Sequence, residues 1–298
     1  MLLVRQICLD WKSLPTRLQF SKQLSSARSP YRTRQLRHFA MASDKTVVLI
    51  TGASSGIGLE SVIALAQKSP DFDILLGSRS VEKGKKTLDD IRSSHASSLK
   101  GSISLLPIDV TDQKSIVAAK EEVETKFGRL DVLINNAGII VTRQTDTLTK
   151  LRETFETNVF GPAIVTETFE PLLKKSSNPR LIYTSSDQGS IAHRLDPTYK
   201  SKYKIRGDYY RMSKSALNML AACHKVDFAE WGCKVCAFNP GFCVTYLTGE
   251  AGRAMRIQNG ARDARDAADA LVEVVTGKRD ADIEKSGIVD LDGGVLPW

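Results

Sequence analysis

A chain of 298 residues with 42% hydrophobic and 26% charged residues has the composition of an ordinary globular protein and is long enough for one large core. No run approaches the ~18 consecutive apolar residues of a bilayer-spanning helix, so no membrane association is expected. The net charge of +8 lies almost wholly in residues 1–41, where eight Lys and Arg face one Asp and give +7; the remaining chain carries +1, which excludes the basic surface typical of a nucleic-acid partner.

Residues 1–41 are rich in Arg and Ser and poor in acidic residues, a composition typical of an organellar transit peptide. A second interpretation is that translation starts at Met41, in "MASDKTVVLI", and the upstream segment is disordered or not made. We expect a cytoplasmic protein, or a mitochondrial one if the segment is a real transit peptide. In either case the folded domain is expected to cover residues 42–298.

From residue 45 onward, short apolar runs alternate with amphipathic stretches. The apolar runs are predicted to be buried strands and cover residues 46–50, 72–77, 102–108, 130–135, 180–185 and 234–239. The amphipathic stretches are predicted helices and include residues 57–68, 80–94 and 112–128. This alternation predicts βαβ units, and therefore a single-domain α/β fold with a Rossmann-type, doubly wound parallel sheet.

The first predicted strand runs directly into "TGASSGIG", residues 51–58. Three glycines permit a tight turn and a close approach of the backbone to a phosphate, and the helix that follows offers free N–H groups. The spacing GxxxGxG differs from the usual GxGxxG. Its place between the first strand and the first helix nevertheless favours a nucleotide-binding loop.

The second predicted strand ends in "LLGSRS" and carries Ser78 and Arg79 where an acidic residue would bind the ribose of NAD. A guanidinium at this place can bind the extra phosphate of NADP. Because Lys83, Lys85 and Lys86 follow closely, the alternative is that Arg79 is a solvated surface cation.

The stretch "GDYYRMSKSALNML" covers residues 207–220, and the apolar spacing of its second half predicts a helix. Residues four apart share a helix face, so Lys214 neighbours Tyr210 while Tyr209 faces Ser213. A Tyr–Lys pair one turn apart is a plausible acid–base device, although surface helices also carry such pairs by chance.

The last predicted strand contains "CKVC" with Cys233 and Cys236. Residues three apart on a strand point to opposite faces, so these thiols are not expected to bind one metal ion, and no metal site is predicted. Buried, reduced thiols suit a reducing compartment.

Taken in order, "TGASSGIG", "NNAG" (residues 135–138) and "YRMSK" resemble the short-chain dehydrogenase/reductase family, and its carbonyl-reductase-like branch in particular. The resemblance covers the chain from about Thr46 to Gly294. It implies NADP(H) as cofactor, a small carbonyl or alcohol as substrate, and catalytic roles for Ser186, Tyr210, Lys214 and Asn158. Ser185 is the alternative to Ser186, and Asn158 could instead only stabilise the fold.

The resemblance also implies which residues contact the cofactor. "IDV" (residues 108–110) would frame the adenine, "NPGFCVT" (residues 239–245) would hold the nicotinamide end, and Asn136 would be a hydrogen-bonding post between strand and cofactor. The full predicted set is Thr51, Gly52, Ser54, Gly56, Ile57, Gly58, Ser78, Arg79, Asp109, Val110, Asn136, Ala137, Gly138, Tyr210, Lys214, Pro240, Gly241, Cys243 and Thr245.

The family chemistry implied is NADPH-dependent reduction of a ketone or aldehyde, with Tyr210 as proton donor. Lys214, together with the positive charge of the oxidised nicotinamide, is expected to lower the pKa of Tyr210 and to bind the nicotinamide ribose. Ser186 would hold the substrate oxygen, and Asn158 a water that links Lys214 to solvent. The alternatives are a non-redox cyclase or isomerase, or an NADP-sensing binding protein, on the same scaffold.

Ser186 and Tyr210 lie 24 positions apart, about twice the usual family interval. The extra segment, residues 192–208, resembles an insertion of the carbonyl-reductase branch. We expect it to form a wall or lid of the substrate pocket through Tyr199, Tyr203 or Arg206, or else to be solvated surface. Its bulk leaves the choice between monomer and homodimer open.

Overall fold

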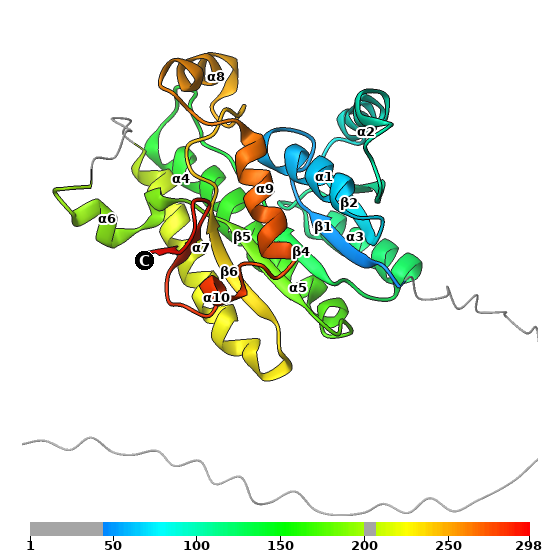
Figure 1. Ribbon diagram of the computed structural model, residues 1–298. Coiled ribbons are helices and arrows are strands. Elements are labelled where there is room, and N and C mark those ends of the chain that lie inside the picture. The colour runs from blue at the N-terminus through cyan, green and yellow to red at the C-terminus, as the bar shows by residue number, and fades with distance from the viewer. Residues whose placement is uncertain (1–43, 200–206) are drawn as a thin grey trace, which may run out of the picture. The chain divides into compact units, whose positions relative to one another are not determined.

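The computed structural model of the chain describes residues 44–199 and 207–298, which fall in one compact unit (Figure 1). The predictions made for residues 1–41 and for Tyr203 and Arg206 lie outside the described residues. Within the described ranges, no helix combines the length and the apolar character needed to cross a membrane.

Among the described residues, a single sheet of eight strands forms the centre of the fold, in the order β3-β2-β1-β4-β5-β6-β7-β8. The first seven strands are parallel and β8 pairs with β7 antiparallel. Their bounds are β1 Thr46–Ile50, β2 Phe72–Ser78, β3 Ser102–Pro107, β4 Val132–Asn135, β5 Arg180–Thr184, β6 Lys234–Asn239, β7 Ile288–Asp290 and β8 Val295–Leu296. The strand order reverses between β1 and β4, which confirms the doubly wound sheet and opens a crevice at the carboxyl ends of these strands.

Helices cover both faces of the sheet, because neighbouring strand residues point to opposite sides. Val48 and Ile50 of β1 pack in the core under α1 (Gly56–Lys68), α2 (Val81–His95) and α9 (Ala264–Val275). Val47 and Leu49 pack in the core under α3 (Gln113–Phe127), α5 (Gly161–Leu173) and α7 (Asp208–Asp227). Figure 1 shows α1 and α9 side by side over one face.

Shorter elements complete the fold at both edges of the sheet. They are α4 (Thr147–Phe155), a π-helical turn (Glu156–Phe160), a 3-10 turn (Asp187–Gly189), α6 (Ile191–Leu195), a second 3-10 turn (Ala229–Trp231), α8 (Gly249–Gln258) and α10 (Asp280–Ile283). In Figure 1, α8 stands out from the body of the domain.

Two sequence predictions about strands have different outcomes. Cys233 and Cys236 lie in the two different core clusters, on opposite sides of the sheet, which confirms the prediction for "CKVC". The strands β7 and β8 were not predicted. They have three and two residues, too few to show a period, and they are joined through Gly293 and Gly294, whose φ angles are 103° and 73°.

Candidate active site

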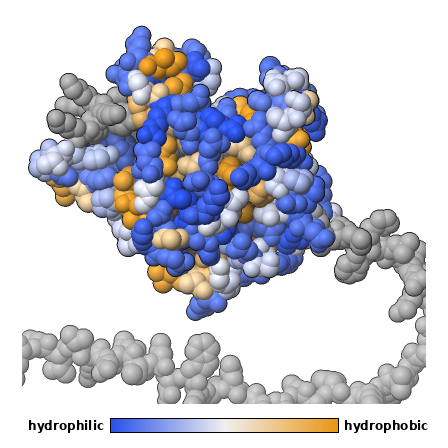
Figure 2. All heavy atoms as spheres, in the orientation of Figure 1, coloured by the Kyte–Doolittle hydropathy of each residue, from blue (hydrophilic) through white to orange (hydrophobic). Residues whose placement is uncertain are grey.

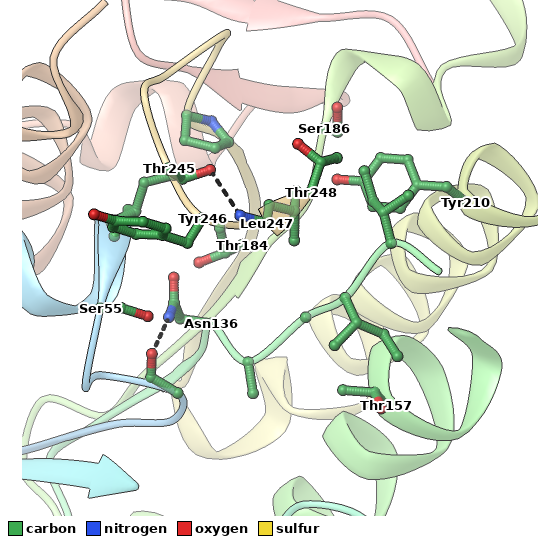
Figure 3. Close-up of a pocket in the computed structure, with 18 of the residues that line it drawn as sticks. Ser55, Asn136, Thr157, Thr184, Ser186, Tyr210, Thr245, Tyr246, Leu247 and Thr248 are labelled. Atoms are coloured by element: carbon green, nitrogen blue, oxygen red, sulfur yellow. Dashed lines mark hydrogen bonds between the residues drawn. The ribbon is translucent and has the colours of Figure 1, made fainter. Parts of the chain in front are cut away.

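A cleft of about 870 Å³ lies at the carboxyl edge of the sheet and contains most of the predicted site residues. Its walls come from the segments that follow six successive parallel strands, from Gly52 after β1 to Gly241 after β6. Figure 3 shows Tyr210 and Ser186 on one side of the cleft and Ser55 and Asn136 on the other, with residues 245–248 between them. The glycine loop near the start of the domain and the later segments with Tyr210 and Gly241 therefore line the same cleft.

The glycine loop brings backbone, rather than side chains, to the cleft. Gly52 has φ 65°, and a Cβ on it would lie 2.8 Å from Cα of Ala137. Gly56 has φ 58° and opens α1, whose preceding residue, Ser55, provides no side-chain cap. The first N–H groups of α1 therefore remain free to bind an anionic group such as a phosphate.

Thr51 and Gly58 do not line the cleft, and their contact with a cofactor stays a prediction. The Thr51 hydroxyl oxygen accepts hydrogen bonds from the backbone N–H of Asn136 (3.0 Å) and Ala137 (3.1 Å), and is thus fully occupied. A Cβ on Gly58 would lie 2.5 Å from Nδ2 of Asn136, and that Nδ2 donates to the Thr51 carbonyl (2.9 Å). These residues shape the loop by joining it to the end of β4.

The part of the cleft that follows β2 is lined by basic residues. Ser78 is buried and donates its hydroxyl to the Ser80 carbonyl (2.9 Å), whereas Arg79 is exposed at the rim. Lys83 lines the same end, and within the described part of the chain neither cation forms an ion pair. Asp109 and Val110 line the neighbouring wall, as predicted for an adenine-binding segment.

Tyr210 and Lys214 lie one turn apart on α7 and both line the cleft. The Lys214 ammonium lies 5.7 Å from the centre of the Tyr210 ring and donates to the Thr184 carbonyl (2.8 Å). Only 4% of Lys214 is exposed, and burial lowers the pKa of Lys214 to about 8. The ammonium is therefore held near the phenol but is easy to deprotonate.

Burial of Tyr210 opposes the expected lowering of its pKa. Burial raises the pKa of Tyr210 to about 12; the Arg256 charge and a hydrogen bond with Ser186 oppose this rise, and Asp187 adds to it. Desolvation of the phenolate outweighs the nearby cations. The free protein thus keeps Tyr210 protonated.

Of the two adjacent serines, Ser186 is the one that meets Tyr210. The Ser185 hydroxyl is buried and donates to Oδ1 of Asn218. Ser186 caps the 3-10 turn: its oxygen accepts from the Gln188 N–H (3.1 Å), and its hydroxyl donates to Oδ1 of Asp187 (3.0 Å). Its contact with Tyr210 favours Ser186 over Ser185 as the predicted serine.

Asn158 is fully buried in the π-helical turn and does not line the cleft. Its Oδ1 accepts from the Ile139 N–H (2.8 Å), and its Nδ2 donates to the Ile139 carbonyl (3.0 Å) and to the Ser213 hydroxyl (3.1 Å). These bonds join the segment after β4 to α7, so the fold-stabilising interpretation has direct contacts. The water-holding role stays a prediction.

Two other tyrosines, Tyr209 and Tyr199, make different contacts. Tyr209 lines the cleft and donates to the Val141 carbonyl (2.8 Å). Tyr199, from the insertion, does not line the cleft, which corrects the prediction that it touches substrate; its hydroxyl donates to Oδ2 of Asp187 (2.5 Å). Gly207, at the described end of the insertion, does line the cleft.

Several lining residues were not predicted individually, because no fixed spacing marks them. They include Ser55, Ser80, Lys83, Asp187, Arg211, Tyr246, Leu247, Thr248, Met255 and Arg256. Arg256 of α8 donates to the Cys243 carbonyl (3.1 Å) and lies over the Phe242 ring, 5.2 Å from its centre. Exposed apolar side chains gather on and beside α8, among them Tyr246, Met255 and Ile257, and Figure 2 shows hydrophobic surface on this projection.

Comparison with known proteins agrees with this geometry. Residues 46–256 match the short chain dehydrogenase family. The short-chain dehydrogenase anuI of Penicillium roqueforti is 40% identical over 228 residues, which cover 74% of this chain and 87% of that protein. The short-chain dehydrogenase/reductase tropE of Talaromyces stipitatus is 32% identical over 270 residues, covering 86% and 99%.

Among solved structures, the NADPH-bound carbonyl reductase from chicken fatty liver is similar, with a TM-score of 0.69, 28% sequence identity and coverage of 85% of this chain and 99% of that one. The non-redox and binding-protein alternatives are not favoured by these relatives. A glycine loop, a Tyr–Lys pair and a serine around one cleft, in a chain that matches the family over most of its length, lead to one conclusion. The chain belongs to the short-chain dehydrogenase/reductase family, oxidoreductases that use a nicotinamide cofactor.

Proposed function

We propose that the protein reduces a ketone or aldehyde to an alcohol with NADPH, in a reversible reaction. The observation that carries this proposal is that Tyr210, Ser186, Lys214 and the glycine loop line one cleft, with the Lys214 ammonium 5.7 Å from the centre of the Tyr210 ring. The similar carbonyl reductase, whose crystals contain NADPH, supports the same choice of reaction and cofactor.

The cleft fits a dinucleotide phosphate on the chemistry of its donors. The free N–H groups at the start of α1 suit the pyrophosphate, and Gly52 lets the loop approach Ala137 more closely than a residue with a Cβ could. Arg79 and Lys83 suit the additional phosphate of NADP, and Lys214 the nicotinamide ribose. When bound, NADPH supplies the hydride.

Residues of the chain donate the proton that the substrate oxygen receives and replace it afterwards. With its pKa raised by burial, Tyr210 carries a proton at neutral pH and donates it to the substrate oxygen. Ser186 turns its hydroxyl toward that oxygen and stabilises the developing negative charge. The Lys214 ammonium, 5.7 Å from the ring, stabilises the phenolate that remains, and a water near Asn158 returns the proton.

The test is turnover of NADPH with a panel of ketones, aldehydes and quinones, including aromatic and polycyclic ketones. Tyr210→Phe keeps the ring and removes the proton, so kcat should fall about 1,000-fold, within the range for loss of a general acid. NADPH binding, followed by the fluorescence of the cofactor, serves as the control and should persist. Cofactor binding by the wild-type protein without turnover of any carbonyl would instead favour a sensor or a non-redox enzyme.

The cofactor preference has its own test. Arg79→Asp places a carboxylate where the additional phosphate would lie, and should shift the kcat/KM ratio from NADPH toward NADH by about 100-fold. Arg92→Asp makes the same charge change on the exposed face of α2, outside the cleft, and should not shift the ratio. An unchanged ratio in Arg79→Asp would contradict the assignment of NADP.

A further inference from the structure

The Asp187 carboxylate connects the proposed catalytic serine to the insertion. One oxygen, Oδ1, accepts the Ser186 hydroxyl at 3.0 Å, and the other, Oδ2, accepts the Tyr199 hydroxyl at 2.5 Å. Asp187 is partly buried and lines the cleft, whereas Tyr199 lies behind it. Hydrogen bonds to a carboxylate are stronger than those between neutral groups, so this bridge can hold two segments together.

The backbone of Asp187 is fixed independently of this bridge. Its N–H donates to Oδ1 of Asn239, at the end of β6 (2.9 Å), and Nδ2 of Asn239 donates to Oδ1 of Asp290, in β7 (2.7 Å). The main chain at Asp187 therefore moves with the sheet. Rotation of the carboxylate remains to be controlled, and Tyr199 makes the short contact that restrains it, at 2.5 Å, whereas Nε2 of Gln188 lies 3.5 Å from each carboxylate oxygen.

Tyr199 is itself held by its own segment. Its ring stacks on the His193 ring of α6, with centres 3.9 Å apart and planes inclined by 12°. Its N–H donates to the Asp196 carbonyl (3.2 Å), and the Asp196 carboxylate closes the turn by accepting from the N–H and the hydroxyl of Thr198, both at 2.7 Å. The tyrosine hydroxyl thus comes to Asp187 from a supported position.

We propose that Asp187 and Tyr199 are positioning residues for the reduction: they fix the side chain of Ser186 and attach the start of the insertion to the wall of the active site. This role rests on the proposed function. Ser186 has one proton, which Oδ1 of Asp187 accepts before substrate binds; the bridge keeps the serine oxygen at the cleft wall, so the hydroxyl needs only to turn about its C–O bond to reach the substrate oxygen. Asp187 also contributes to the raised pKa of Tyr210, which keeps the phenol protonated for reduction.

Three variants distinguish a positioning role of the Asp187 side chain from an effect of its negative charge. Asp187→Ala removes both hydrogen bonds, and kcat should fall about 20-fold, in line with the loss of hydrogen bonds to a charged group, while KM for NADPH stays constant. Asp187→Asn still offers an acceptor to Ser186 and a donor to the Tyr199 oxygen, and should restore kcat to within about threefold of wild type. Tyr199→Phe keeps the stack on His193 and should lower kcat about fivefold.

The double variant Asp187→Ala/Tyr199→Phe tests whether the two residues act through one bridge. Its kcat should equal that of Asp187→Ala, because the tyrosine hydroxyl has then lost its acceptor. Multiplied effects in the double variant, or a kcat of Asp187→Ala within twofold of wild type, would overturn the proposal. Thr198→Val, the matched control, removes a neighbouring hydroxyl that donates to Asp196 and, among residues 44–199 and 207–298, to no atom of Asp187 or Ser186, and should leave kcat unchanged.

Hydrogen–deuterium exchange keeps the two proposals distinguishable. If the wild-type protein reduces no carbonyl compound, the proposed function fails, and the bridge is judged from exchange alone. Loss of the bridge should speed exchange of the amides of residues 192–199 in Asp187→Ala and Tyr199→Phe alike, and not in Thr198→Val. Unchanged exchange in the first two variants would reject the attachment of the insertion by Asp187.

Discussion

The two halves of the cleft are built by different means. The proposed cofactor half consists of the glycine loop and residues 136–138, where the main chain at Gly52 approaches that of Ala137 so closely that a Cβ would lie 2.8 Å from the Ala137 Cα. The substrate half consists of residues 187–211, as far as they are described, and residues 242–256, where side chains make the contacts. Tyr246 and Met255 there are 53% and 41% exposed.

This difference fits the different tasks of the halves. A cofactor of constant shape can be bound by backbone groups whose positions the sheet determines. A substrate pocket made of side chains on short helices can change without disturbing the sheet, because those side chains contribute little to the core. We therefore expect substitutions in the first half to affect cofactor binding and stability together, and substitutions in the second half to affect kcat or substrate KM while NADPH affinity and stability stay unchanged.

The largest effect is expected at Gly52. An Ala there needs an unfavourable left-handed conformation and places its Cβ 2.8 Å from Cα of Ala137, so the loop must move. NADPH affinity should fall at least about 100-fold, and the unfolding free energy by about 2 kcal/mol or more. Fluorescence titration with NADPH and thermal denaturation measure the two effects.

Gly128→Ala is the matched control for this prediction. Gly128 ends α3 with φ 73°, and a Cβ on it would have no neighbour within 4 Å. The replacement should cost about 1 kcal/mol through the left-handed conformation alone and leave NADPH affinity unchanged. Similar NADPH affinities for the two variants would mean that the close approach at Gly52 is unimportant, and would remove the first half of the comparison.

A second effect concerns the pH dependence of Lys214. Burial lowers the pKa of Lys214 to about 8 and raises that of Tyr210 to about 12, so the lysine is the first of the two to lose its proton as the pH rises. If NADPH binding needs the ammonium, kcat/KM for NADPH should decline about tenfold per pH unit above pH 8. Lys214→Arg stays charged and should abolish this decline, even if its kcat is lower.

Lys83→Arg makes the same replacement at the exposed end of the cleft and should leave the pH profile unaltered. A wild-type profile that stays flat to pH 10 would show that the ammonium is not required. The pH dependence of the unfolding free energy reports on the same lowered pKa of Lys214. The unfolded chain binds the Lys214 proton more tightly than the folded one, so the unfolding free energy should rise as the pH increases from about 8 toward 10.5.

The sequence located the glycine loop at the carboxyl edge of the sheet because the requirements of such a loop are local. Glycines at Gly52 and Gly56 are needed where the backbone turns and approaches a ligand, and such positions can be recognised from order and spacing. Spacing does not reveal which way a side chain points. Thr51, Gly58 and Asn158 belong to the motifs, yet their contacts are with neighbouring segments and not with the cleft.

The substrate half could not be predicted residue by residue. Arg256 reaches the cleft because α8 folds back over Cys243, a tertiary contact that no short spacing encodes. The direction in which the Tyr210 pKa shifts also could not be predicted from the sequence. The neighbouring cation is evident from the helix period, but the cost of burying the phenolate depends on the walls that several distant segments build.

The smallest effect should come from the most exposed part of the substrate half. Tyr246 is 53% exposed, and its ring lies 5.2 Å from the Arg253 guanidinium, a contact within α8 and the segment before it. Tyr246→Ala removes apolar surface beside the cleft and should raise KM for a carbonyl substrate about threefold, while the melting temperature and KM for NADPH stay the same. Steady-state kinetics with each substrate varied in turn would measure the two KM values. A change in KM for NADPH as large as that for the carbonyl compound would show that the two halves are not independent, because a side chain that leaves the sheet and the glycine loop untouched would then still control the binding of the cofactor.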